Sequence, residues 1–302
     1  MYTLVMKKLQ FTGERIIPEQ NKGASFFYDH ILRYLFVQQI IKNKIVLDAG
    51  CGVGYGSFLL AEGGPKKIYA LDKSKEAIDY GKIKYSHNRI EFHIDNVEKI
   101  KSVKAKSVDV ATCFELIEHL KTADNLLREL KKTMKESAIL VISTPNKKNY
   151  LEGNPHHLHE YYPEELFTEL KKYFKNVEFY YQAYEFTNII KKEGLNSFSF
   201  EEKFQVNNQV IYSTQLTNEN AQCIIAVCSD IKIPQIRGLS INAHKIDNFD
   251  LIKGFDSRKM EIEHESRVID NMSKELTVIK KSKFYKIWRM FNDIKDYFFR
   301  NK

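Results

Sequence analysis

The chain has 302 residues, of which 43% are hydrophobic, 13% aromatic and 28% charged. This apolar fraction excludes a disordered chain, and the length fits one large domain or two modest ones. Four cysteines are too few for a disulfide framework and show no CxxC spacing, which favours a reduced, cytoplasmic protein. The N-terminus lacks the apolar core of a signal peptide. No apolar run reaches the roughly 18 residues that a membrane span needs.

The net charge of +8 is concentrated at the C-terminal end. Residues 280–302 contain eight Lys or Arg and two Asp, so this segment alone carries +6. The remaining 279 residues carry about +2, which is close to neutral. The basic character therefore belongs to a tail, and the body does not have the composition of a nucleic-acid-binding surface.

The first 150 residues alternate short apolar runs with amphipathic stretches. The predicted strands are 44–50, 66–72, 89–95, 107–113 and 137–144. The stretches with a helical pattern are 55–63, 74–87, about 97–101 and 121–135, with Ser74 as a helix cap. Strands that alternate with helices at this spacing indicate βαβ units and a parallel sheet covered on both faces.

A helix at 163–173 and strands at 176–182 and 221–229 complete the pattern. We therefore predict an α/β fold with a Rossmann-like, seven-stranded, mostly parallel sheet and helices on both faces. The predicted domain covers residues 1–230, with a polar insertion at 183–220 and a linker at 231–256. Apolar residues at spacings of 7, 3, 4 and 3 from Ile262 to Ile279 then predict a helical tail, a short coiled coil followed by a basic amphipathic helix, over 257–302.

The segment VLDAGCGVGYGSFLLA (46–61) follows a strand and opens a helix. Its glycines allow a tight turn and a close approach to a ligand, and the helix N-terminus offers free N–H groups. The spacing differs from a nicotinamide fingerprint, whose third glycine would fall at Tyr55. Asp72 ends the next strand, where a carboxylate can accept both ribose hydroxyls. Asp95 ends the following one, in a position to meet an adenine amino group.

With these residues together, the chain resembles the class I S-adenosylmethionine-dependent methyltransferases over roughly residues 24–230. The matching segments are DAGCGVG at 48–54, LD at 71–72, IDN at 94–96 and FELIEHL at 114–120. The resemblance implies S-adenosyl-L-methionine as cofactor, with the transferred methyl beside the end of the fourth strand. The cofactor-binding residues that it predicts are Arg33, Asp48, Gly50, Cys51, Gly52, Gly54, Asp72, Lys73, Asp95, Asn96, Phe114 and Glu115.

Four further segments resemble methyltransferases that are encoded with bacterial polysaccharide and lipopolysaccharide enzymes. They are TGERIIP (12–18), YDHILRYLF (28–36), GYGSFLLAE (54–62) and NPHHLHEYYPEEL (154–166). Asp29 replaces the family's glutamate, and His156 replaces an aromatic residue. The resemblance implies an O-methyltransferase acting on a glycan or glycan precursor, at a sugar hydroxyl or a phosphate, with His157 and Glu160 matching the family's histidine and glutamate.

A sugar hydroxyl is a poor nucleophile, so a general base within hydrogen-bond reach would help the transfer. His157 and His119 are both predicted at the carboxyl edge of the sheet, where ligands bind in such folds. The sequence favours His157 as the catalytic base and places His119 second. A phosphate acceptor would need no base, and these residues would then orient it.

Several alternatives stay open at this stage. Glu118 and His119 could be metal ligands, as in some ubiquinone-pathway methyltransferases that they resemble, although we predict no metal. His156, His157 and His159 have no partner spacing that would close a metal cluster. The chain could also be a quinone-type small-molecule O-methyltransferase, a non-catalytic scaffold that retains the fold, or an RNA methyltransferase.

The basic tail has two predicted uses. Its aromatic and basic residues could lie on an anionic bilayer, which would make a cytoplasmic protein peripheral at the inner face of the membrane. The predicted coiled coil at 257–279 could instead bind another glycan enzyme or form a homo-oligomer. We expect a saccharide or lipid-linked glycan as acceptor, and we do not expect nucleic acid as a partner.

Overall fold

The computed structural model describes residues 9, 15–21, 25–149, 154–184, 188–192 and 216–241, all within one compact unit, Lys8–Asp247. The predicted coiled coil and basic helix (257–302) lie outside the described residues, as do most of the predicted insertion and linker. Within the part that the structure describes, none of the helices could span a membrane.

A single sheet of nine strands organises the described residues, in the order β3-β2-β1-β4-β5-β8-β6-β7-β9. Its strands are β1 (Ile45–Ala49), β2 (Lys67–Asp72), β3 (Ile90–Ile94), β4 (Val108–Phe114), β5 (Met134–Pro145), β6 (Asn176–Tyr184), β7 (Asn188–Lys192), β8 (Cys223–Ser229) and β9 (Leu239–Ile241). All seven predicted strands are confirmed. The short strands β7 and β9 extend the sheet at its far edge.

The parallel part of the sheet is formed by the first five predicted strands. β1 pairs in parallel with β2 and β4, β2 with β3, and β4 with β5. β8 then runs antiparallel between β5 and β6. Because β1 connects to β2 on one side and lies beside β4 on the other, the strand order reverses at β1. This switch point is where ligands bind in open α/β sheets.

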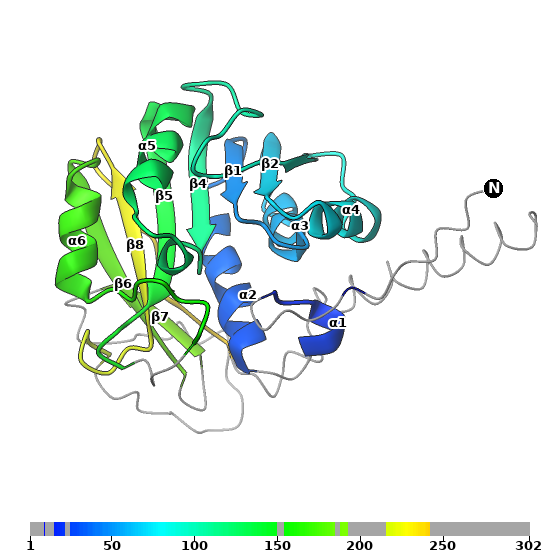
Figure 1. Cartoon of the computed structure of the whole chain (residues 1–302). Coiled ribbons are helices and arrows are strands. Elements are labelled where there is room, and N and C mark those ends of the chain that lie inside the picture. Colours follow the sequence, from blue (N-terminus) through cyan, green and yellow to red (C-terminus); the bar gives the residue numbers. More distant parts are fainter. Residues whose placement is uncertain are drawn as a thin grey trace, which may run out of the picture. The chain divides into compact units, whose positions relative to one another are not determined.

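The described helical segments are α1 (Pro18–Asn21), α2 (Ser25–Gln38), α3 (Tyr55–Glu62), α4 (Lys75–Lys84), the 3-10 turn η1 (Ile117–His119), α5 (Asp124–Thr133) and α6 (Pro163–Lys171). Helices α1 and α2 precede β1 in the chain, and the other helices connect successive strands and flank the sheet (Figure 1). The Ser74 side chain accepts a hydrogen bond from the Ala77 N–H at the start of α4, which confirms the predicted cap.

The two faces of the central strands bury different sets of side chains. Leu47 and Ala49 belong to the apolar core that α5 and α6 complete. On the other face of the same strand, the buried Asp48 bonds to Ser57 of α3. α3 in turn packs against α2, since a Cβ on Gly56 would lie 1.9 Å from the Tyr34 ring. Alternate residues of β1 thus connect the apolar core with a polar network beneath the loop that follows.

One sequence prediction about local structure is wrong, and one confirmed strand is longer than predicted. Residues 97–101 form a loop and not a helix, because the Asp95 carboxylate accepts the N–H groups of Lys101 and Ser102 and closes a turn. β5 begins at Met134, three residues before the predicted strand. A short amphipathic pattern is too weak to nucleate a helix when side-chain acceptors compete for its backbone donors.

Candidate functional site

The loop between β1 and α3 turns through three glycines with positive φ. Gly50, Gly52 and Gly54 have φ of 79°, 56° and 86°. The N–H groups of Gly50 and Cys51 both donate to the Leu71 carbonyl, at 2.8 and 2.9 Å, which attaches the loop to β2. The loop therefore curls back over the carboxyl end of the sheet before the chain enters α3.

Close packing adds to the requirement for glycine. A Cβ on Gly54 would lie 2.4 Å from Cε1 of Phe92, and one on Gly50 would lie 2.8 Å from a methyl of Leu116. A Cβ on Gly52 would meet nothing within 4 Å. Gly50 and Gly54 are therefore fixed by both backbone conformation and space, whereas Gly52 is the position open to a ligand.

Asp48 lies beneath this loop and is 1% exposed. Its carboxylate accepts the hydroxyl of Ser57 at 2.6 Å and that of Thr112 at 2.9 Å. Burial raises the pKa of Asp48 to about 6, and the hydrogen bonds, including one from Tyr34, oppose the rise. This network joins β1, β4 and α3 at the start of the glycine loop.

Asp72 ends β2 beside the glycine loop. One carboxylate oxygen accepts the Gly52 N–H at 3.0 Å and the other accepts the Ser74 N–H at 2.8 Å. Ser74 also accepts a hydrogen bond from Arg15 at 3.0 Å. Asp72 is half-buried, so the carboxylate is held in place yet remains accessible to a hydroxyl-bearing ligand, while the neighbouring Lys73 is exposed.

Asp95 and Asn96 follow β3 and form the loop that replaces the predicted helix. One oxygen of Asp95 accepts the N–H groups of Lys101 and Ser102 and the Ser102 hydroxyl, at 2.7–2.9 Å. Its other oxygen accepts the Asn96 N–H at 2.8 Å. Although burial opposes it, these donors hold the pKa of Asp95 below its usual value. The adenine contacts of both residues remain predictions.

Glu115 comes directly after β4 in a strained backbone conformation with φ of 48°. Its carboxylate accepts the Ser143 hydroxyl at 2.7 Å and lies 3.2 Å from the Arg33 guanidinium. Burial opposes ionisation, but Arg33, His30 and the hydrogen bonds hold the pKa of Glu115 below its usual value. A strained, charged residue at the end of the fourth strand is a feature of functional sites.

Arg33 reaches Glu115 from α2 and is 4% exposed. Its Nε donates to Gln182 of β6 at 2.7 Å, and its buried Nη1 is the nitrogen that lies 3.2 Å from Glu115 Oε1. The ring of Phe114 lies against Tyr34, the residue after Arg33, with centroids 5.1 Å apart. The structure thus brings the predicted residues of α2 and β4 together.

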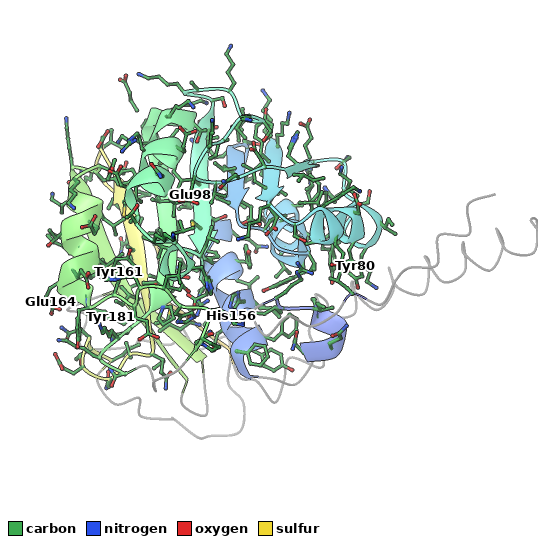
Figure 2. The ribbon with its side chains drawn as sticks, viewed as in Figure 1. Tyr80, Glu98, His156, Tyr161, Glu164 and Tyr181 are labelled. Carbon is green, nitrogen blue, oxygen red and sulfur yellow. The ribbon has the colours of Figure 1, made fainter. Side chains whose placement is uncertain are left out.

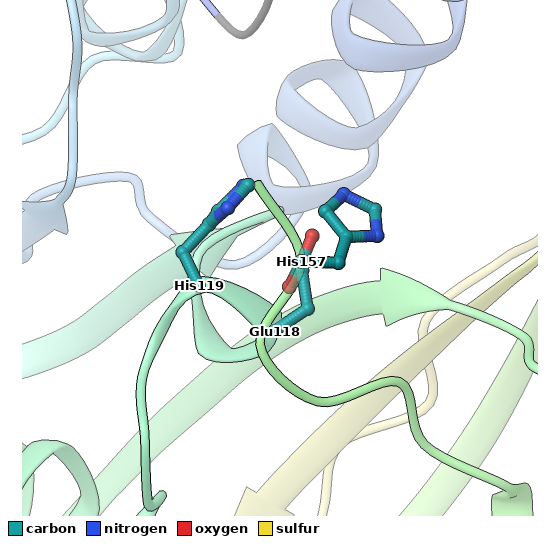
Figure 3. A group of neighbouring side chains, drawn as sticks. All are labelled: Glu118, His119 and His157. Atoms are coloured by element: carbon teal, nitrogen blue, oxygen red, sulfur yellow. The ribbon is translucent and has the colours of Figure 1, made fainter. Parts of the chain in front are cut away.

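Glu118, His119 and His157 form a cluster at the same end of β4 (Figure 3). One ligand atom from each residue lies within 4.8 Å of the others, and the two imidazole rings are 5.0 Å apart. The Glu118 carbonyl accepts the N–H groups of Leu158 and His159, which holds the histidine loop against η1. Figure 2 shows His156 of this loop at the end of the sheet toward which β4 points in Figure 1.

The two histidines differ in how their ring nitrogens are used. Nδ1 of His157 lies 3.2 Å from Glu160, and its Nε2 lies 2.9 Å from the Asn154 amide nitrogen. A carboxylate accepts and an amide NH2 donates, so Nδ1 carries the proton and the Nε2 lone pair is already used. Nδ1 of His119 contacts the His156 carbonyl at 3.0 Å and must donate to it, which makes Nε2 the basic nitrogen.

Glu118 is fully buried, and only one of its oxygens is hydrogen-bonded, to Thr144 at 3.1 Å. Its Oε1 has no hydrogen-bond partner among the described residues. Burial and the neighbouring Glu115 raise the pKa of Glu118 well above its usual value. This carboxylate and His119 could each offer a ligand atom to a metal ion. His157 could join them only by giving up Asn154 or Glu160, so the donor set does not fit a ready three-ligand site.

Sequence reasoning missed several parts of the site. Arg15 lies in the quoted TGER segment, but nothing local showed that it reaches Ser74. The sequence placed Gln182 in a strand and gave it no role in the site. Its side-chain oxygen accepts a hydrogen bond from Arg33 Nε, and its amide nitrogen donates to the Asp29 carbonyl. Ser57 lies in the first turn of α3, directly after the glycine loop. This position is the feature of the sequence from which its contact with Asp48 could have been predicted.

A glycine-rich loop at the switch point of a Rossmann-like sheet, followed by acidic residues at successive strand ends, defines a nucleoside-cofactor-binding α/β enzyme fold. Residues 40–201, more than half of the chain, match the family described as a methyltransferase domain. The chain belongs to this family, and the order β3-β2-β1-β4-β5 of its parallel strands is Rossmann-like.

Two groups of curated proteins are similar to the chain. A "probable S-adenosylmethionine-dependent methyltransferase" from Mycobacterium tuberculosis is 32% identical over 163 residues, covering 52% of this chain and 58% of that protein. A ubiquinone biosynthesis O-methyltransferase from Coxiella burnetii is 32% identical over 118 residues, covering 38% of this chain and 50% of the relative. The chain therefore spans between 48% and 63% of the length of the curated relatives that it resembles.

A solved structure of an S-adenosylmethionine-dependent methyltransferase from Listeria monocytogenes is also similar. It is 14% identical, with a TM-score of 0.45, and the match covers 68% of this chain and 99% of that chain.

Proposed function

We propose that this protein is an S-adenosylmethionine-dependent O-methyltransferase that acts on a glycan or a glycan precursor. The observation that carries the proposal is the glycine loop, whose Gly52 N–H is held by the Asp72 carboxylate directly above the buried Asp48. Family membership and the names of the M. tuberculosis and C. burnetii relatives support the activity and the cofactor.

The described residues offer matching partners for the parts of this cofactor. Gly52, with no atom near its Cβ position, leaves room for the methionine moiety, and Asp72 would accept the ribose hydroxyls. The buried guanidinium of Arg33, which also pairs with Glu115, would be the cation that attracts the cofactor's carboxylate. The ionised Glu115 nearby favours a positively charged sulfonium.

The cofactor, when bound, supplies an electrophilic methyl group on a sulfonium whose leaving group is neutral. The protein then has to align the acceptor oxygen with that methyl, exclude water and accept one proton. We propose His119 for this proton, since its Nδ1 contacts the His156 carbonyl and Nε2 is then the basic nitrogen. For His157, whose two ring nitrogens contact Glu160 and Asn154, we propose the role of positioning the loop, which is the opposite of the order that the sequence favoured.

A glycan acceptor is supported by the four sequence segments that resemble methyltransferases of polysaccharide synthesis. Two of them surround the candidate site: Arg33 of the second segment pairs with Glu115, and the fourth segment carries the loop of His157. The TGER segment supplies Arg15 to the cap of α4 beside Asp72.

A quinone-type small-molecule O-methyltransferase is the second candidate. Several similar proteins are named as ubiquinone biosynthesis O-methyltransferases, including that of Neisseria meningitidis serogroup C, 28% identical over 125 residues, which cover 40% of this chain and 52% of that protein. Glu118 and His119, which resemble metal ligands of some ubiquinone-pathway methyltransferases, follow β4 in the segment FELIEHL (114–120). A phenolic acceptor ionises more readily than a sugar hydroxyl and would depend less on His119.

The decisive experiment is incubation of the full chain with methyl-labelled S-adenosylmethionine and separated lysate fractions. Label in lipid-linked saccharide or nucleotide sugar supports the glycan proposal, and label in a quinone precursor supports the second candidate. Label in RNA would contradict both. If calorimetry detects no cofactor binding by the chain, the protein is a scaffold and the proposal of an enzyme fails.

The tail is part of the proposal, although residues 257–302 lie outside the described residues. Its net charge and aromatic residues support contact with an anionic membrane at the cytoplasmic face. Liposome pelleting of the full chain and of a variant lacking 280–302 tests this. Equal pelleting of the two would contradict the membrane role and leave protein docking as the use of the tail.

A further inference from the structure

The sheet ends at β3 on the side away from β8. β3 pairs with β2 and, among the described residues, with no other strand. The Arg89 carbonyl accepts the Ile68 N–H, and the Asp95 N–H donates to the Asp72 carbonyl, so the odd-numbered residues of β3 face β2. Because the direction alternates along a strand, the backbone groups of Ile90, Phe92 and Ile94 point to the outer edge.

Among the described residues, a groove borders the outer edge of β3. A groove of about 370 Å³ is lined by Lys82, Ser86, His87, Ile90, Glu91, Phe92 and His93. The four consecutive β3 residues in this lining show that the groove runs along the edge of the strand, since a pocket over one face would meet only alternate residues. A strand laid in the groove would extend the sheet by edge pairing.

The sequence of β3, Ile-Glu-Phe-His-Ile, is nearly symmetric about Phe92. We propose that β3 is a dimer interface and that a second copy of this chain pairs with it antiparallel, about a two-fold axis at Phe92. In that register Ile90 faces Ile94 of the second copy, and Glu91 faces its His93. A two-fold axis needs such a self-complementary surface.

The hydrogen bonds available at the edge fit this register. Phe92 points outward in both copies, so the two residues can exchange a pair of N–H to carbonyl bonds. The Ile94 N–H of each copy can donate to the Ile90 carbonyl of the other. The Ile90 N–H already donates to the His87 carbonyl within its own chain at 3.0 Å, so the Ile94 carbonyl of the other copy finds no donor there and the register offers four interchain bonds.

The side chains also suit a second copy rather than an unrelated strand. Glu91 is half exposed, at 52%, and pairs with Lys67 at 2.7 Å, which keeps its pKa low and the group ionised. Facing His93 of another copy, it meets an imidazole and not a like charge. On the opposite face Ile94 is 50% exposed, and pairing would cover this apolar side chain.

Sedimentation of the full chain over a concentration series tests the proposal. We expect a dimer that dissociates on dilution. His93→Glu, which sets like charges opposite each other at two symmetric positions, should raise the dissociation constant by about tenfold or more. Exchanging the pair, Glu91→His with His93→Glu, should restore the dimer. Ile94→Pro removes an outward N–H without touching the β2 ladder and should also weaken it.

Cross-linking tests the register. The four native cysteines are all buried. Ile90→Cys combined with Ile94→Cys should give a covalent dimer under mild oxidation, whereas either substitution alone should not, because each residue faces the other in the second copy. A chain that stays monomeric at every concentration overturns the proposal. So does a dimer whose dissociation constant is unchanged by both His93→Glu and Ile94→Pro.

Discussion

The carboxylate of Asp72 accepts the N–H of Gly52 at 3.0 Å, which fixes the glycine loop of β1 to the end of β2. The same side chain accepts the Ser74 N–H at the start of α4. One carboxylate therefore sets the position of two segments, the glycine loop and the start of α4.

Replacing Asp72 with alanine should weaken cofactor binding strongly. A hydrogen bond to a charged group contributes about 1.5–3 kcal/mol, so the dissociation constant for S-adenosylmethionine should rise by roughly 10- to 100-fold. Calorimetry measures the change. Asp79→Ala is the matched control, since Asp79 pairs with Lys75 on the exposed surface of α4. Equal affinities for the Asp72 variant and the wild type would exclude the ribose contact.

Gly54→Ala should destabilise the fold by about 2–4 kcal/mol, combining a left-handed backbone penalty with overpacking against Phe92. Gly52→Ala shares the positive φ but meets no neighbour, so it should cost only about 1–2 kcal/mol. Urea unfolding of both variants separates the free-energy cost of overpacking from the cost of the left-handed backbone. If the two lose the same stability, the packing argument for Gly54 is wrong.

The unfolding free energy should decrease as the pH rises from about 4 to about 6, because of Asp48. Burial raises its native pKa to about 6, so the native state holds a proton that the unfolded chain releases at lower pH. The effect is on the order of 2–3 kcal/mol. Asp48→Asn should abolish this component, as measured by denaturant unfolding at several pH values. An unchanged slope would show that Asp48 ionises normally.

His119→Ala should lower kcat by roughly 100-fold or more if this residue accepts the proton of the acceptor hydroxyl. Cofactor affinity should stay unchanged, because no cofactor-binding role is assigned to His119. His157→Gln, which removes the imidazole but keeps a polar side chain in the loop, should cost less. A larger loss of kcat in the His157 variant would return the catalytic role to His157.

Chelation should leave methyl transfer intact. The cluster offers Glu118 and His119 as ligands, but the ring nitrogens of His157 already contact Glu160 and Asn154. Dialysis against a chelator, followed by an activity assay, checks this expectation. Loss of activity that is restored by a divalent cation, together with Glu118→Gln being inactive, would establish a metal enzyme instead.

The sequence by itself determined the βαβ pattern, the glycine loop, the Ser74 cap and the acidic strand ends. These features are local: strand periodicity, backbone freedom at glycine and a side chain that caps its own helix all act within a few residues. For the same reason all seven predicted strands were found, while residues 97–101 were assigned wrongly, since Asp95 and not local propensity decides their conformation.

Only the tertiary structure determined which side chains form ion pairs and which of their polar atoms take part in hydrogen bonds. Arg33 meets Glu115 and Gln182 across 82 and 149 positions of sequence, and no local pattern encodes such a contact. The choice between His119 and His157 depends on a loop that packs on the Glu118 carbonyl and uses both nitrogens of His157. Hydrogen bonds and burial act through space, so the protonation and orientation of side chains follow from packing and not from order along the chain.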